Sequence, residues 1–351
     1  MSISDFEHWN ENIEDFLTDI DQRRIAMSKY ANNWSSEDRA DFFELTHAYN
    51  QMIFLFSCVL NEIQDGQLGF TYSRFVRRLT DSDTIITFNW DCLLDRCLHE
   101  LTPWRPTNGY GLSFDSIYMN GWLQPNRACR APVELLKLHG STNWVMPYLS
   151  FNLHTSFKEP ASRLFDFGDF PIGCFLYAKD VYETYRNRSR PGYPPYSYFY
   201  YPPSFPRWIQ RQKTPDHDTL LFGGAPDVIP AGSTVRNGSD FLTMPMIVGP
   251  VRLKDYDFAG NRFRSLWTKA LRSMATSDVT TVIGYSFPPT DTEAWRLLQR
   301  AVSLSENQFH MRIVDPYPRS LAERIRSEFG MRVNLEVIES TFESAVAEAT
   351  G

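Results

Sequence analysis

The chain has 351 residues, of which 42% are hydrophobic and 15% aromatic, enough to bury the core of one large domain or two modest ones. Its formal net charge of −7 at pH 7, without a long run of like charge, disfavours nucleic acid as a direct ligand. The apolar run 52–60 is too short to span a bilayer, and the acidic, amphipathic start of the chain is unlike a signal peptide. The five cysteines form no C-x-x-C pair, which argues against a structural zinc site and against a disulfide framework. We therefore expect a soluble, cytoplasmic protein with no metal and no membrane partner.

Residues 1–80 are expected to form a helical N-terminal segment. Apolar residues recur at helical spacing between positions 6 and 20 and again between positions 42 and 56. Ser35, with Asp38 three positions later, is a suitable start for the second of these helices. Tyr72–Leu79 is a third, short helical candidate with a basic face that we place on the surface. No strand is predicted in this segment.

Residues 81–351 are expected to form an α/β domain. The predicted strands are 84–88, 133–139, 278–285, 310–314 and 333–338, and the predicted helices are 92–101, 263–274, 292–304, 318–329 and 341–349. Thr290 and Glu293 predict a capping box for the helix that begins at position 292. Strands that alternate with helices of about ten to fifteen residues are typical of βαβ units. The predicted fold is therefore a doubly wound, Rossmann-like parallel sheet.

An insert of about residues 145–250 interrupts this alternation. Prolines and aromatic residues crowd together there, most densely in Pro191–Trp208, and such proline spacing opposes both helices and central strands. The aromatic content is nevertheless too high for a disordered linker. We expect an ordered, loop-rich insert over the sheet edge. It could be a lid, a surface for a partner, or simple packing.

Polar residues follow four of the predicted strands: Asn89 and Asp91, His139 and Ser141, Gly284 and Ser286, and Asp315. Because the carboxyl ends of parallel strands share one edge of a sheet, where ligands of open α/β sheets bind, these residues can converge. Each alone has a simpler explanation. Asn89 and Asp91 could only end a strand and cap a helix, and His139 could be a structural histidine. Gly284 could be a tight turn and Asp315 a helix start. Together they favour a nucleotide site.

Three sequence blocks carry a family resemblance. They are T-F-N-W-D at 87–91, K-L-H-G-S-T-N-W at 137–144 and V-I-G-Y-S-F-P-P-T-D at 282–291. In order and approximate spacing they resemble the blocks of sirtuin-like domains, above all those of divergent bacterial sirtuin-like proteins in anti-phage defence. The resemblance covers roughly residues 36–345, in patches, and does not include the insert. It implies NAD+ as the substrate.

The resemblance assigns catalytic roles to three residues. Asn89 and Asp91 would contact the nicotinamide ribose and carboxamide region, and His139 would be the catalytic base beside the ribose. These residue types suit the chemistry, because cleavage of the nicotinamide–ribose bond passes through an oxocarbenium-like state and mainly needs positioning and charge stabilisation. A histidine whose pKa lies near neutrality can take a proton from water or from a ribose hydroxyl. No metal is required.

Five further residues would contact the nucleotide according to the same resemblance. Gly284 and Ser286 would line the pocket, and Asp315 would recognise the adenosine side. Thr87 and Ser141 belong to the first two blocks and are also candidates for binding.

Two features of the family are absent from the sequence. No Gly-Ala-Gly phosphate-binding turn precedes Thr84, and no zinc-binding cysteine module is present, which speaks against lysine deacylation. The missing turn leaves three alternatives: a start further upstream, a degenerate domain, or a partner that supplies the turn. The resemblance implies an NAD+ glycohydrolase, the effector of a bacterial defence system, restrained by homo-oligomerisation or by a partner protein. The alternative is a catalytically degenerate subunit that acts as a scaffold or a nucleotide sensor.

Overall fold

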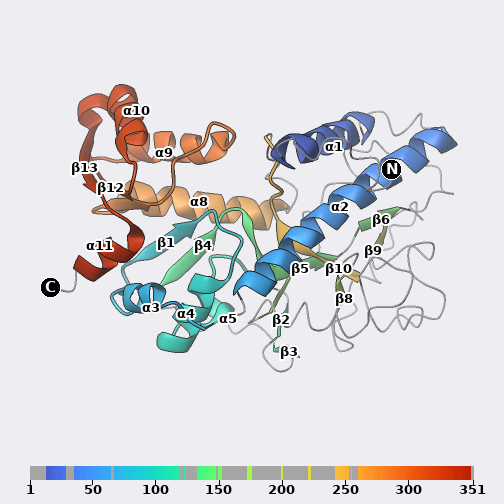
Figure 1. The fold of residues 1–351 in the computed structure, drawn as a ribbon, viewed down its shortest axis with the longest axis horizontal. Coiled ribbons are helices and arrows are strands. Elements are labelled where there is room, and N and C mark those ends of the chain that lie inside the picture. The colour runs from blue at the N-terminus through green and yellow to red at the C-terminus, as the bar shows by residue number, and fades with distance from the viewer. Residues whose placement is uncertain are drawn as a thin grey trace.

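The structure, a computed structural model, describes residues 13–28, 35–64, 67–114, 116–118, 122–123, 133–147, 149–151, 172–175, 199–200, 220–222, 242–252, 254 and 260–348. Figure 1 shows the arrangement of its helices and strands. In these residues no helix combines the length and the apolar character that a membrane crossing needs.

Three helices lie in the N-terminal segment: α1 (Ile13–Ser28), α2 (Ser36–Gln64) and α3 (Phe70–Val76). The start of α2 is stabilised by a reciprocal pair of hydrogen bonds. Asp38 donates its backbone N–H to Ser35 Oγ at 3.1 Å, and Ser35 donates its backbone N–H to Asp38 Oδ2 at 2.8 Å. The predicted start of this helix is therefore confirmed.

All five predicted strands of the α/β part are present, and they pair in parallel. β1 (Thr84–Thr87) pairs with β4 (Glu134–Lys137), and β12 (Phe309–Asp315) pairs with both β11 (Thr280–Ile283) and β13 (Val333–Glu339). Helix α9 (Thr292–Leu304) connects β11 to β12, and α10 (Arg319–Phe329) with the 3₁₀ turn η5 (Gly330–Arg332) connects β12 to β13. The fold class is thus mixed α/β with parallel pairing. Among the described strands, however, nothing joins β1 to β11, so the parallel strands form two separate sheets.

Helices cover both sides of the β1–β4 pair. Figure 1 shows α8 (Gly260–Thr276) on one side and α3 with α4 (Leu93–Leu101) on the other. Leu266 of α8, Leu98 of α4, and Leu135 and Leu136 of β4 are all fully buried in one hydrophobic core. The short helices α5 (Pro106–Gly109) and α11 (Phe342–Glu348) complete this part.

A further, mainly antiparallel sheet was not predicted. It has the order β3-β2-β7-β5-β10-β8, with β2 (Ser116–Tyr118), β3 (Trp122–Leu123), β5 (Gly140–Pro147), β7 (Gly173–Phe175), β8 (Phe199–Tyr200) and β10 (Leu242–Ile247). A further pair joins β6 (Leu149–Phe151) to β9 (Leu220–Phe222). The described parts of the predicted insert are therefore strands. β8 lies within the proline-rich stretch and is an edge strand of its sheet. Pro245 lies in the central strand β10 at a shift of register, where a central strand tolerates proline. The other parts of the insert lie outside the described residues.

The predicted capping box at the start of α9 is wrong. The N-cap is Asp291, whose Oδ1 accepts a hydrogen bond from the backbone N–H of Ala294 at 3.4 Å, while Glu293 pairs with Arg296. The cap lies one residue later than the box requires. Aspartate is also a stronger N-cap than threonine.

A sharp turn joins β4 directly to β5, which belongs to the other sheet. Gly140 adopts a φ of +79°, and a Cβ at this position would lie 2.0 Å from the backbone oxygen of Met246. Only glycine fits such a position. The turn consequently fixes His139 at the junction of the two sheets.

Candidate functional site

Three strand ends meet at a small aromatic cluster. Phe88 follows β1, His139 follows β4 and Tyr285 follows β11. The rings of Phe88 and Tyr285 are stacked, with centroids 4.4 Å apart and an interplanar angle of 14°. The ring centroid of His139 lies 5.0 Å from that of Phe88, in an edge-to-face arrangement. Three of the four strand ends that were predicted to converge thus lie together, although β1 and β11 do not pair, and His139 is the predicted residue that belongs to the cluster.

Asp291 joins this cluster to the start of α9. Its Oδ2 lies 3.0 Å from His139 Nε2 and 3.1 Å from Lys254 Nζ, and it accepts a hydrogen bond from the Tyr285 hydroxyl at 2.6 Å. Asp291 is only 1% exposed. A buried carboxylate is stable only when it is paired and hydrogen-bonded, and Asp291 meets both conditions.

The electrostatics of the cluster favour a carboxylate beside a neutral imidazole. Burial acts to raise the pKa of Asp291, but the hydrogen bonds from His139 and Tyr285 and the charge of Lys254 outweigh it, so that this pKa is lowered. Burial lowers the pKa of His139, and the hydrogen bond to Asp291 only partly opposes it. The pKa of Tyr285 is raised, first by burial and then by Asp291, which keeps its hydroxyl protonated.

His139 is held in a fixed orientation. Besides the contact of its Nε2 with Asp291, the ring makes a hydrogen bond to the backbone of Phe88. A carboxylate that orients an imidazole is the arrangement found in general-base catalysis. To act as a base, however, His139 must expose a nitrogen lone pair to the substrate. The hydrogen bond of the His139 ring to Asp291 or to the backbone of Phe88 therefore has to break when the substrate binds.

A cavity of about 610 Å³ lies beside the aromatic cluster. It runs between β1 and β11, and three of the predicted site residues line it: Thr87, Asn89 and Gly284. Asn89 is exposed, and its backbone N–H donates to Thr87 Oγ1 at 3.1 Å. Phe88 and Tyr285 also line the cavity. Their stacked rings therefore connect it to His139, which is not one of the lining residues.

The other four predicted residues do not line this cavity. Asp91 Oδ1 accepts a hydrogen bond from the backbone N–H of Leu93 at 3.0 Å, at the start of α4. Asp315 Oδ1 accepts one from the backbone N–H of Tyr317 at 2.7 Å, just before α10. Ser141 is buried elsewhere, and Ser286 is exposed. Asp91 and Asp315 thus make the contacts of residues at a helix start. The roles of all four residues in binding NAD+ stay predictions.

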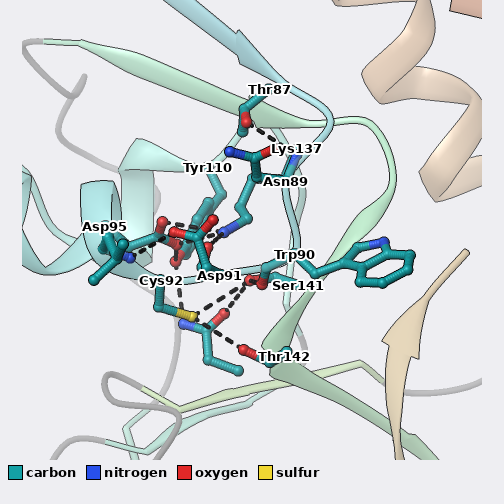
Figure 2. Close-up of polar contacts among 12 residues, drawn as sticks. Thr87, Asn89, Trp90, Asp91, Cys92, Asp95, Tyr110, Lys137, Ser141 and Thr142 are labelled. Atoms are coloured by element: carbon teal, nitrogen blue, oxygen red, sulfur yellow. Dashed lines mark hydrogen bonds and ion pairs between the residues drawn. The ribbon is translucent and has the colours of Figure 1, made fainter. Parts of the chain in front are cut away.

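A buried ion pair joins Lys137 of β4 to Asp95 of α4, as Figure 2 shows. Lys137 Nζ lies 3.1 Å from Asp95 Oδ2 and also donates to the backbone oxygen of Asp91. The Tyr110 hydroxyl donates to Asp95 Oδ1. Burial acts to lower the pKa of Lys137, but the Asp95 carboxylate reverses the effect, and the net shift is upward. Lys137 is therefore charged at neutral pH, and its contact with the backbone of Asp91 anchors the chain between β1 and α4.

Further polar side chains connect the Lys137–Asp95 ion pair to the mainly antiparallel sheet. Asn143 donates to the Tyr110 hydroxyl at 3.1 Å and to the backbone oxygen of Phe175 at 2.8 Å, and Ser141 Oγ donates to Asn143 Oδ1 at 2.7 Å. The thiol of Cys92 lies 3.6 Å from Ser141 Oγ. Ser141 consequently serves the internal network (Figure 2) and contacts no part of the cavity.

Asp291, Tyr285 and Lys254 belong to the site but were not predicted from the sequence. Asp291 and Tyr285 could have been predicted, because both belong to the third sequence block and Tyr285 stands between two predicted residues. Lys254 lies in no recognisable motif, and no signal in the sequence marks it.

Comparison with known proteins adds no assignment. No protein-family model matches the chain, and no match was found among the curated proteins. Within the described part of the chain, no group of three or more His, Cys, Asp or Glu side chains is placed to hold a metal ion.

Proposed function

We propose that this chain is an NAD+ glycohydrolase that releases nicotinamide and ADP-ribose. The observation that supports it best is the meeting of three strand ends at the Phe88–His139–Tyr285 cluster, with a carboxylate behind the histidine and a cavity in front of the rings. The substrate would bind at the end of this cavity where Asn89 and Gly284 follow β1 and β11. We also assign the two parallel sheets to one Rossmann-like, doubly wound fold, whose ligands bind at the carboxyl ends of its strands.

In this reaction a water molecule attacks the anomeric carbon of the nicotinamide ribose. The N-glycosidic bond breaks, and nicotinamide leaves as a neutral molecule with the bonding electron pair. Asn89, which is exposed on the cavity wall, would hold a ribose hydroxyl or the attacking water. His139 would take the proton of the water, and the Asp291 carboxylate would stabilise the imidazolium that forms.

The test is nicotinamide release by the purified chain, measured by chromatography. His139→Gln and Asn89→Ala should lower the rate, the former by about 10²–10⁴-fold if the histidine is the base. His310→Gln and Asn334→Ala are matched controls, because both residues are exposed, contact each other at 3.1 Å and lie away from the cavity. They should retain the parental rate. A folded parent that releases no nicotinamide would overturn the assignment.

A second candidate is a catalytically degenerate subunit that acts as a scaffold or a nucleotide sensor. It is favoured by the two contacts that already engage the His139 ring. This candidate predicts that NAD+ is either not bound or bound without turnover, which calorimetry and the nicotinamide assay together distinguish. In either case the resemblance suggests a role in anti-phage defence, with homo-oligomerisation or a partner protein as the restraint.

A further inference from the structure

The two parallel sheets turn open edges toward the same cavity. β1 pairs with β4 on one side, and β11 pairs with β12 on one side. No described strand pairs with the second side of either. The cavity of about 610 Å³ is lined by residues from Ser82 to Asn89 along β1 and from Ser277 to Tyr285 along β11. The space between the edges therefore runs along the whole length of both strands.

The backbone groups that face this space can be assigned from the pairing on the other side. Thr87 O accepts a hydrogen bond from Leu138 N at 2.9 Å, so Thr87 faces β4 and its neighbour Ile86 faces the cavity. Gly284 N donates to Val314 O at 3.0 Å, so Ile283 and, two residues earlier, Thr281 face away from β12. Both edges thus offer free strand-pairing groups to the cavity. The strands are parallel within each sheet, and β1 and β11 both end at the stacked rings of Phe88 and Tyr285, so the two sheets point the same way.

The order of the strands identifies what is missing. Across the cavity the order reads β4-β1, then a gap, then β11-β12-β13. The doubly wound fold has the strand order 3-2-1-4-5-6. In chain order β1, β4, β11, β12 and β13 correspond to strands two to six of that sheet. The gap is the position of its first strand, which lies at the centre.

We propose that a strand of another polypeptide docks between β1 and β11 and completes a six-stranded parallel sheet. A strand in this gap is hydrogen-bonded on both sides, so a strand that is already paired in a sheet cannot enter it. All described strands of a second copy are paired in this way, and a separate extended segment is therefore the occupant.

The walls of the gap define the chemistry of this segment. It spans about five or six residues, the usual length of a strand. Its side chains are apolar, because they join a core that already includes Ile86 and Val282. Asp83 and Asp278 flank the amino end of the gap, so a lysine or arginine should precede the strand. At the carboxyl end the walls are Asn89, Gly284 and Tyr285.

The test uses a fluorescein-labelled peptide, R-I-V-V-V-I, and the complete 351-residue chain. Binding is measured by fluorescence anisotropy without NAD+, so the result does not depend on the proposed activity. The parent should bind the peptide in a saturable manner. Thr281→Pro removes a backbone N–H that faces the gap, and it leaves the hydrogen bonds to β12 in place. This variant should weaken binding of the peptide by at least ten-fold. The same peptide with proline at two alternate positions should not bind.

Glu339→Pro is the matched control, because it places proline on β13 at the far edge of the same sheet. Ser340 N donates to Asp315 O, so the N–H of Glu339 faces away from β12. This variant should bind the peptide as the parent does. A folded parent that does not bind, or equal weakening by both proline variants, would overturn the proposal. Self-association that Thr281→Pro abolishes and Glu339→Pro does not would also overturn it, because a second copy would then be the occupant.

Discussion

Asp291 connects segments that are far apart in the chain, because its carboxylate contacts His139 after β4, Lys254 after β10 and Tyr285 after β11. We expect Asp291→Asn to lower the free energy of unfolding by about 3 kcal/mol, since it leaves Lys254 without its buried counter-charge. Denaturant titration measures this change. Asp315→Asn alters the same group at the end of the neighbouring strand, where the carboxyl accepts only a local turn hydrogen bond, and should cost less than about 1 kcal/mol. Similar losses in the two variants would contradict the role of Asp291.

His139 should make the protein sensitive to mild acid. Burial lowers its pKa below the ordinary value of 6.5 in the folded state. Above pH 6.5 the imidazole is neutral in both states, and its contribution to stability is complete. Below this pH the unfolded chain takes up a proton that the folded protein resists, so stability falls by at most about 1.4 kcal/mol per pH unit until the folded pKa is reached.

The pKa of Asp291 is also lowered, from an ordinary value of 3.8, so its contribution is lost only below that pH. The window between about pH 4 and pH 6.5 therefore excludes Asp291, but it includes His99, whose pKa burial also lowers. His139→Gln should weaken the dependence of the melting temperature on pH between pH 6.5 and 5, and the remaining dependence includes the part of His99. His310→Gln, an exposed control, should leave this dependence unchanged.

At the scale of elements, two ion pairs of equal length differ in what surrounds them. Lys137–Asp95 is buried, with side chains 1% and 3% exposed, and Lys269–Glu134 is partly exposed, with 45% and 36%; both distances are 3.1 Å. Lys137→Met leaves the Asp95 carboxylate buried without its counter-charge, at a cost of about 3–5 kcal/mol. Lys269→Met should cost no more than about 1 kcal/mol, because solvent screens the exposed pair.

The double variant Lys137→Met/Asp95→Leu completes the test by thermal unfolding. It removes both charges, so we expect it to recover at least half of the loss in the single variant. If Lys137→Met proved as mild as Lys269→Met, the buried pair would not anchor α4 against β4.

The strands and helices of the α/β part could be predicted because each carries its own pattern. The run T-I-I-T and the amphipathic helix 292–304 need no distant partner to be recognised. The sheet built from β2, β5, β7 and β10 could not be predicted in this way. Its short strands find their partners far along the chain, and the polar stretch Ser141–Asn143 is buried by contacts that only the tertiary structure supplies. Local propensity says little about such strands.

At the scale of the whole molecule, the order of the strands explains why the candidate site was only partly predictable. The sequence located the strand ends correctly, and Thr87, Asn89 and Gly284 share one cavity. It could not show that this cavity continues between β1 and β11, because a missing strand leaves no pattern to read. Nor could it show that Asp91 and Asp315 make local turn contacts, since the same residue types serve as helix caps and as ligands.

The rate at which the thiols of Cys92 and Cys174 are alkylated should report how often the polar network opens. Both are fully buried; burial raises the pKa of Cys92 to about 11 and that of Cys174 well above its ordinary value. Alkylating reagents attack the thiolate, so these cysteines can react only after the surrounding structure opens. Peptide mass spectrometry of iodoacetamide-treated protein should find both unmodified while the protein is folded. In Lys137→Met both should be labelled faster, by roughly ten-fold for each 1.4 kcal/mol lost from the opening free energy.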